Sequence, residues 1–188
     1  IGIAQVNPCV GDIAGNASLI IEYAGRARAG QQAEAVIYPE LMLTGYPPED
    51  LLLRPALYRQ IESALDRIRQ ASAGMKLIFG YPRRAGDIVY NSCAVVEDGE
   101  LGAWYDKIEL PNYGVFDEKR YFGAGDRPCM IDLGGIPAAL RICEDIWSPK
   151  PTSPALAPAL GPTCTTRVPS GASSPVWSQP SSRRLSAR

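Results

Sequence analysis

The sequence predicts a layered α/β fold with mixed sheets, and three observations support this prediction. A strand, a helix and a second strand follow one another within residues 1–38, which is the order of a βαβ unit. Two dipeptides with glycine, Asp98-Gly99 and Gly134-Gly135, each separate two apolar runs, as in a β-hairpin. A parallel crossover and hairpins in one chain favour mixed sheets over a purely parallel, doubly wound sheet.

The first unit consists of two short apolar runs with a helical repeat between them. Ile1–Val6 and Ala35–Tyr38 are predicted to be buried strands. Asn16 is predicted to cap the helix, which ends near Gly30. The apolar positions at helical spacing are Leu19, Ile20, Tyr23, Ala24 and Ala27. Leu41–Arg54, which contains two prolines, is expected to form a loop.

A second helix is predicted from Pro55, because proline suits the first turn of a helix. Its apolar stripe is Leu57, Ile61, Leu65 and Ile68, and it stops near Gly74. A third buried strand, Lys76–Gly80, comes next. The hairpin strands are predicted at Ile88–Glu97, Glu100–Trp104, Met130–Leu133 and Ile136–Ile142. The last of these strands is expected to run directly into Cys143.

Composition excludes several classes of protein. The 188 residues are 46% apolar and 21% charged, which is typical of one globular domain. No apolar run approaches the roughly 20 residues that span a bilayer, and no signal peptide is evident, so we expect no membrane partner. Five widely spaced cysteines with no CxxC pair and no histidine argue against a zinc site and a disulfide framework. The lack of histidine also excludes Ser-His and Cys-His catalysis, and a reducing cytoplasm is the expected location.

The charge pattern divides the chain after residue 147. Residues 1–147 hold all 20 acidic and 14 basic residues, whereas 148–188 hold five basic and no acidic residues. The second segment also contains eight Pro and nine Ser in 41 residues. We expect residues 148–188 to be disordered, either as a natural Pro/Ser-rich linker or as the product of a shifted reading frame. Five charges in this segment are too few to predict a nucleic-acid partner.

Three segments carry reactive side chains at positions where strands are predicted to end. Glu40 follows the second predicted strand, Ala35–Tyr38. Lys107 follows the strand predicted at Glu100–Trp104, and Cys143 follows the last predicted strand. A cysteine at a strand-to-turn junction can offer its thiol and the next backbone N–H, here of Glu144, to a substrate. Each residue alone has an ordinary alternative: a loop carboxylate, a solvated lysine or a buried core cysteine.

Taken together and in this order, the three segments resemble the nitrilase superfamily, whose members use a Glu, a Lys and a Cys. Within it, YPELMLTGYPPEDLLLRP (Tyr38–Pro55) closely resembles the amidase domains of glutamine-dependent NAD synthetases. DKIELPNYGVFDEKRYF (Asp106–Phe122) and RICEDIW (Arg141–Trp147) agree with it. The resemblance covers residues 1–147 and none of 148–188. It implies an αββα sandwich with mixed sheets, incomplete at its C-terminal side, in which 1–147 form a partial glutamine amidase domain.

The resemblance also implies roles for individual residues. Glu40 would be the general base, Lys107 would stabilise the oxyanion, and Cys143 would attack the side-chain amide of glutamine. Glu118 corresponds to a supporting glutamate. Candidates for holding glutamine are Tyr46, Tyr113 and Glu144. The products would be glutamate and ammonia, without a histidine.

The amidase reaction implied in this way needs no cofactor and no metal. ATP and Mg²⁺ serve the separate synthetase domain of the family enzymes, which uses the ammonia to make NAD from deamido-NAD, and nothing in 148–188 matches that domain. A synthetase domain or a homo-oligomer is a possible partner. Two alternatives stay open: an inactive remnant of such an enzyme, or a nitrilase-type amidase for another small amide.

Overall fold

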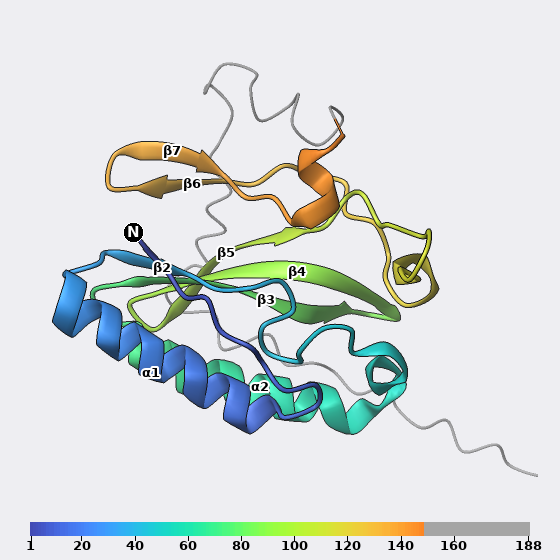
Figure 1. Ribbon diagram of the computed structural model, residues 1–188, viewed down its shortest axis with the longest axis horizontal. Helices are drawn as coiled ribbons and strands as arrows, with labels where there is room; N and C mark the ends of the chain where they lie inside the picture. The colour runs from blue at the N-terminus through green and yellow to red at the C-terminus, as the bar shows by residue number, and fades with distance from the viewer. Residues whose placement is uncertain (149–188) are drawn as a thin grey trace, which may run out of the picture.

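The computed structural model describes residues 1–148 (Figure 1). The prediction about the Pro/Ser-rich segment therefore lies, from residue 149 onward, outside the described residues. The strands are β1 (Gly2–Ile3), β2 (Ala35–Ile37), β3 (Lys76–Ala85), β4 (Ile88–Glu97), β5 (Glu100–Asp106), β6 (Met130–Leu133) and β7 (Ile136–Ala139). The helices are α1 (Ile13–Gln31) and α2 (Pro55–Ala71), with short 3₁₀ helices η1 (Glu49–Leu53), η2 (Glu118–Arg120) and η3 (Cys143–Ile146).

The first five strands form one mixed sheet in the order β1-β2-β3-β4-β5. β1, β2 and β3 are parallel neighbours, whereas β3, β4 and β5 are antiparallel. β6 and β7 form a separate two-stranded antiparallel sheet. The predicted βαβ unit, both hairpins and the mixed character of the sheet are therefore confirmed.

The described residues form three layers (Figure 1). α1 and α2 cover one face of the five-stranded sheet, and the β6–β7 hairpin lies over the other face. One apolar core fills the space between helices and sheet. A second core joins Ile78, Val95 and Tyr105 of the large sheet to Ile131 of β6. Helix, sheet and second sheet are three of the four layers of an αββα sandwich.

α2 forms as predicted because sequence and packing agree. Pro55 occupies its first turn, and Leu57, Ile61 and Ile68 of the predicted stripe are buried. The predicted Leu65 is only partly buried, and the adjacent Ala64 is buried instead. None of the helices within residues 1–148 is long and apolar enough to cross a membrane.

Two local predictions are wrong. Asp12, not Asn16, caps α1, since its carboxylate accepts the Gly15 N–H at 2.9 Å. Asn16 lies inside the first turn, where its buried side chain bonds the backbone of Cys9 and Leu43.

The second error concerns the approach to the predicted nucleophile. β7 ends at Ala139, because its partner β6 begins at Met130 and pairs with Ala139. Three residues, Leu140 to Ile142, then lead the chain to Cys143, which starts η3. The remaining differences are in strand length: β1 covers only part of Ile1–Val6, and β3 continues to Ala85 along β4.

Candidate active site

A fully buried lysine lies between two carboxylates in the middle of the described structure. Lys107 directly follows β5, and its side chain is 0% exposed. Its ammonium donates to Glu40 Oε1 at 2.8 Å and to Glu118 Oε1 at 3.0 Å. Lysine is almost never fully buried without such partners. The solvated-lysine alternative is therefore excluded by the structure.

The opposite charges in this cluster stabilise one another. Burial opposes the charge on Lys107, but the carboxylates of Glu40 and Glu118 outweigh burial and raise its pKa. Lys107 is thus a cation at neutral pH. Burial also raises the pKa of Glu118, an effect that the nearby Lys107 partly offsets.

Cys143 has an exposed thiol on an unusual backbone. Its φ is 44°, in the left-handed region that residues other than glycine rarely adopt. Partial burial of the thiol and the negative charge of Glu40 raise its pKa, while the positive charge of Lys107 lowers it. The thiol is therefore mostly protonated at neutral pH, and its use as a nucleophile requires a base beside it.

Glu40 and Cys143 line the same cavity, of about 260 Å³. Its walls are mainly apolar and come from both sheets, including Ile78 of β3 and Ile131 of β6. Apolar walls with a few polar groups are typical of a small-molecule site. The cavity therefore has both a candidate nucleophile and a candidate base in its lining.

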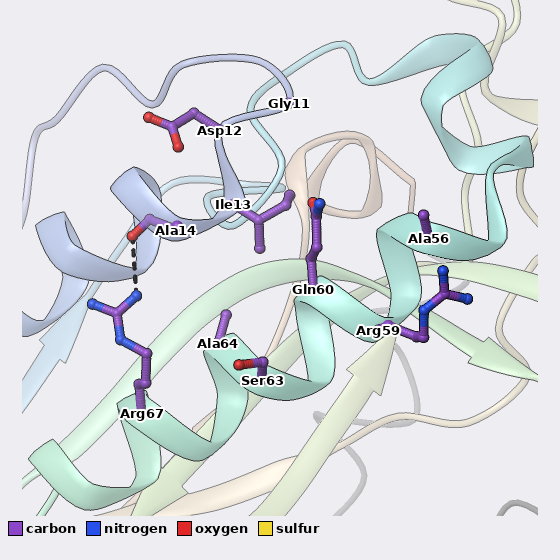
Figure 2. Close-up of a pocket in the computed structure, with 10 residues that line it drawn as sticks. All are labelled: Gly11, Asp12, Ile13, Ala14, Ala56, Arg59, Gln60, Ser63, Ala64 and Arg67. Carbon is purple, nitrogen blue, oxygen red and sulfur yellow. Dashed lines mark hydrogen bonds between the residues drawn. The ribbon is translucent and has the colours of Figure 1, made fainter.

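A larger cavity of about 490 Å³ lies elsewhere, between the start of α1 and one side of α2 (Figure 2). Asp12, Arg59, Gln60 and Ser63 line it, and Arg67 donates to the Ala14 carbonyl oxygen at 3.3 Å (Figure 2). None of the predicted site residues lines this cavity. Size alone therefore does not locate the chemistry, and the smaller cavity is the better candidate.

Close backbone contact holds Glu40 against the sheet. The loop after β2 bonds Gly80 of β3 on both sides: Gly80 N–H donates to Pro39, and Leu43 N–H donates to Gly80. A Cβ on Gly80 would overlap the Leu41 nitrogen and lie 2.8 Å from the Glu40 carbonyl carbon. Glu40 can approach Lys107 because residue 80 has no side chain.

We expect Gly80→Ala to destabilise the chain by about 1–3 kcal/mol, because backbone atoms cannot move aside as a flexible side chain would. Denaturant unfolding would measure the change. Gly102→Ala is the matched strand control, since its Cβ would meet only the Val95 oxygen at 4.0 Å. Equal effects of the two substitutions would contradict this account of Gly80.

The three residues predicted to hold glutamine lie in two groups. Tyr46 donates to Glu118 Oε1 at 3.3 Å, so its ring borders the Lys107 cluster. Tyr113 donates to Glu144 Oε2 at 2.9 Å, beside Cys143. Both tyrosines are partly exposed, at 37% and 59%. Glu144 offers a carboxylate to a cationic group near the thiol.

Asp145, which is not among the predicted site residues, joins the candidate nucleophile Cys143 to the segment that follows Lys107. Its side chain is 0% exposed and accepts four hydrogen bonds. The donors are Tyr105 Oη at 2.8 Å and the N–H groups of Ile108 at 3.1 Å, Glu109 at 2.8 Å and Ile142 at 3.2 Å. This carboxylate therefore fastens the turn that carries Cys143 to the segment that follows Lys107.

Replacing Asp145 with alanine should lower the free energy of unfolding by at least about 3 kcal/mol, since it leaves buried donors without an acceptor. Urea unfolding measures this loss. Asp132→Ala is a suitable control, because exposed Asp132 accepts a single bond from Gly135 N–H. A loss below about 1 kcal/mol in Asp145→Ala would refute the fastening role.

The structure thus brings Glu40, Lys107, Glu118 and Tyr46 together directly. Cys143 lines the same cavity as Glu40, and the charges of Glu40, Lys107 and Glu118 all act on its thiol. Asp145 and Asn91, a buried neighbour of Glu40, were missed. The available signal for Asn91 was a polar residue within the apolar run of β4, and for Asp145 its place two residues after Cys143.

The chain is similar to known proteins in both sequence and fold. Residues 1–159 match the carbon-nitrogen hydrolase family. The glutamine-dependent NAD(+) synthetase of Xanthomonas campestris is 45% identical over 154 residues, covering 80% of this chain and 28% of that protein. The Thermotoga maritima synthetase is 42% identical over 156 residues, covering 82% and 27%. The chain thus spans under a third of the length of these relatives.

Solved structures give the same result. The glutamine-dependent NAD+ synthetase from Acinetobacter baumannii, in complex with ADP, superposes with a TM-score of 0.78 at 39% identity. The match covers 81% of this chain and 29% of the synthetase chain. A variant of the amidase from Nesterenkonia sp. in complex with butyramide gives a TM-score of 0.70 at 27% identity. This match covers 79% of this chain and 57% of the amidase chain. Amidases of the nitrilase superfamily therefore share the described fold.

Proposed function

The chain belongs to the carbon-nitrogen hydrolase family, and from this premise we propose that it carries a site for hydrolysing glutamine to glutamate and ammonia. The observation that carries the proposal is the buried Lys107, held by Glu40 and Glu118 beside the cavity of Cys143. Burying a charged lysine costs desolvation energy that pairing repays only in part, so a fully buried lysine favours a functional role for its charge. The amidase chemistry uses it to stabilise an oxyanion.

In the proposed reaction, Glu40 takes the thiol proton and the Cys143 sulfur forms a bond to the amide carbon. Lys107 and the backbone N–H of Glu144 stabilise the negative oxygen that develops. The C–N bond then breaks, the nitrogen takes the proton from Glu40, and ammonia leaves. Glu40 next accepts a proton from water, which attacks the thioester, and the thiol is restored as glutamate departs.

Glutamine is the proposed substrate because Glu144 can pair with its α-ammonium group, with Tyr113 holding the carboxylate of Glu144. Tyr46 is the third proposed substrate residue. Among the relatives, glutamine-dependent synthetases share 45% and 42% identity with the chain. A second candidate is an amidase for small uncharged amides, favoured by the butyramide complex of the related amidase.

A panel of amides separates the two candidates. The 188-residue chain should release ammonia faster from glutamine than from butyramide or asparagine. Glu144→Gln should raise the KM for glutamine about tenfold, since one charge-assisted contact of about 1.5–3 kcal/mol is weakened. The rate with butyramide should not change, and exposed Glu100→Gln is the control. A preference for butyramide would reject glutamine as the substrate.

The same proposal covers the domain that holds the site, the use of its ammonia and its cellular location. Residues 1–147 would form the amidase part, and its ammonia would supply ATP- and Mg²⁺-dependent NAD synthesis by a synthetase domain. The amidase step itself would use no cofactor, because its groups are side chains of this chain. A free Cys143 thiol requires a reducing environment, which favours the cytoplasm. The partner would be a synthetase domain or a second copy of the chain, and light scattering would measure association between copies.

A further inference from the structure

Asn91 lies at the centre of the site without a role in the reaction proposed above. It sits in the middle of β4, opposite Pro82 of β3, and is 0% exposed. Its side-chain Nδ2 donates to Glu40 Oε1 at 2.7 Å. Its backbone carbonyl accepts the N–H of Lys107 at 2.9 Å. One residue therefore contacts both the carboxylate and the lysine.

We propose that Asn91 is a positioning residue that holds Glu40 in the orientation needed to take the proton of Cys143. This inference rests on the proposed amidase function. Asn91 Nδ2 and Lys107 Nζ both donate to Oε1 of Glu40, at 2.7 and 2.8 Å. Within residues 1–148, no donor bonds Oε2. The second oxygen is thus left for the thiol proton.

The orientation of the Asn91 amide follows from chemistry. Oxygen and nitrogen of an amide are easily interchanged in a structure. With the reverse orientation, Asn91 Oδ1 would face a carboxylate oxygen, and two acceptors would repel each other. An ionised Glu40 only accepts hydrogen bonds, so Nδ2 must be the atom that faces it.

Asn91 is a poor choice for stability alone. Its Oδ1 is buried and has no hydrogen-bond partner among the described residues, which costs about 1–3 kcal/mol. Asn16, also buried, is different: its Nδ2 donates to Cys9 and Leu43, and its Oδ1 accepts the Cys9 N–H. Asn16 fastens a loop, whereas the one side-chain bond of Asn91 goes to the proposed base.

An uncharged donor suits this position. A hydrogen bond to the ionised carboxylate favours the ionised form without adding a second cation beside Lys107. Four ionisable groups interact electrostatically with Glu40. They are Lys107 after β5, Glu118 of η2, Tyr46 of the loop between β2 and η1, and Cys143 of η3. Removing Asn91 Nδ2 therefore takes away one of the two donors to Glu40 Oε1 and leaves this carboxylate less well oriented.

The test compares Asn91→Leu with Asn16→Leu in the 188-residue chain. Asn91→Leu should lower kcat for glutamine about 10- to 100-fold with little change in KM, because a base rather than a binding contact is weakened. The acidic limb of the kcat/KM profile should move up by about one pH unit. Its melting temperature should stay within a few degrees, because the leucine removes an unpaired buried oxygen.

Asn16→Leu should show the opposite pattern, with a lower melting temperature and an unchanged pH profile. If Asn91→Leu does not fold, Asn91→Ala serves in its place. An unchanged kcat in a folded Asn91 variant, or a pH profile that moves equally in the Asn16 variant, would overturn the positioning role.

A second readout separates this inference from the proposed function. The pH dependence of Cys143 alkylation by iodoacetamide is followed by mass spectrometry of the labelled peptide. Asn91→Leu should shift this profile by about half a pH unit or more, but not in the Glu40→Gln background. If the unmodified chain hydrolyses no glutamine, the proposed function fails. The Asn91 inference then fails only if the alkylation shift is absent or is independent of Glu40.

Discussion

Replacing Cys143 with alanine is expected to lower glutamine hydrolysis by more than about 10³-fold, because the reaction loses the atom that bonds the substrate. Cys143 is the exposed thiol that shares a cavity with Glu40. Its left-handed backbone, at φ 44°, presents this thiol at the start of η3. The substitution should leave the melting temperature nearly unchanged, since little packing is lost.

The matched control is Cys9→Ala, which removes another exposed thiol away from this cavity. Its rate of glutamate release should equal that of the unmodified chain. Hydrolysis that continues unchanged in Cys143→Ala would reject Cys143 as the nucleophile. Trapping of a γ-glutamyl adduct on the Cys143 peptide, seen by mass spectrometry, would support it directly.

Lys107→Met is expected to remove activity and to destabilise the fold by about 3–5 kcal/mol at neutral pH, the usual result of breaking a buried ion pair. Methionine fills much of the volume of the lysine stem. However, it leaves the carboxylates of Glu40 and Glu118 facing each other without a cation. Chemical denaturation at pH 7 would measure the loss.

The loss of folding stability in Lys107→Met should shrink as the pH falls, because Glu118 can then take up a proton. Burial already raises the pKa of this carboxyl, and removing Lys107 raises it further. A carboxyl with a raised pKa in the folded state binds a proton more tightly when folded, so acid stabilises the folded form. Lys107→Met should therefore recover stability between neutral pH and about pH 5.

Two controls make this result specific. Lys76→Met breaks the Lys76–Glu97 pair, which is 23% and 42% exposed, and should cost under about 1 kcal/mol. The double variant Lys107→Met/Glu118→Gln should regain part of the stability at pH 7, because one negative charge is removed. A destabilisation of Lys107→Met that is the same at all pH values would contradict the electrostatic explanation.

Local sequence patterns were sufficient wherever an element depends on residues close in the chain. The helical repeat of Leu57, Ile61 and Ile68, with Pro55 at its start, gave the position of α2, which ends at Ala71, shortly before Gly74. Asp98-Gly99 fixed the β4–β5 hairpin, since both residues adopt positive φ there. Where a distant contact decides, the local pattern failed. Asn16 has the residue type of an N-cap, but its side chain donates to the Leu43 carbonyl oxygen, 27 positions away, from inside α1.

The layered α/β class, the order of the main elements and the candidates Glu40, Lys107 and Cys143 could all be predicted from patterns and motifs in the sequence. The full burial of Lys107 between two carboxylates, and the link that Asp145 makes from the cysteine turn to the segment after Lys107, became visible in the folded chain. Burial and charge pairing depend on residues far apart in the chain, which local patterns do not contain. Glu40 and Lys107 are 67 positions apart, yet their charged atoms lie 2.8 Å from each other.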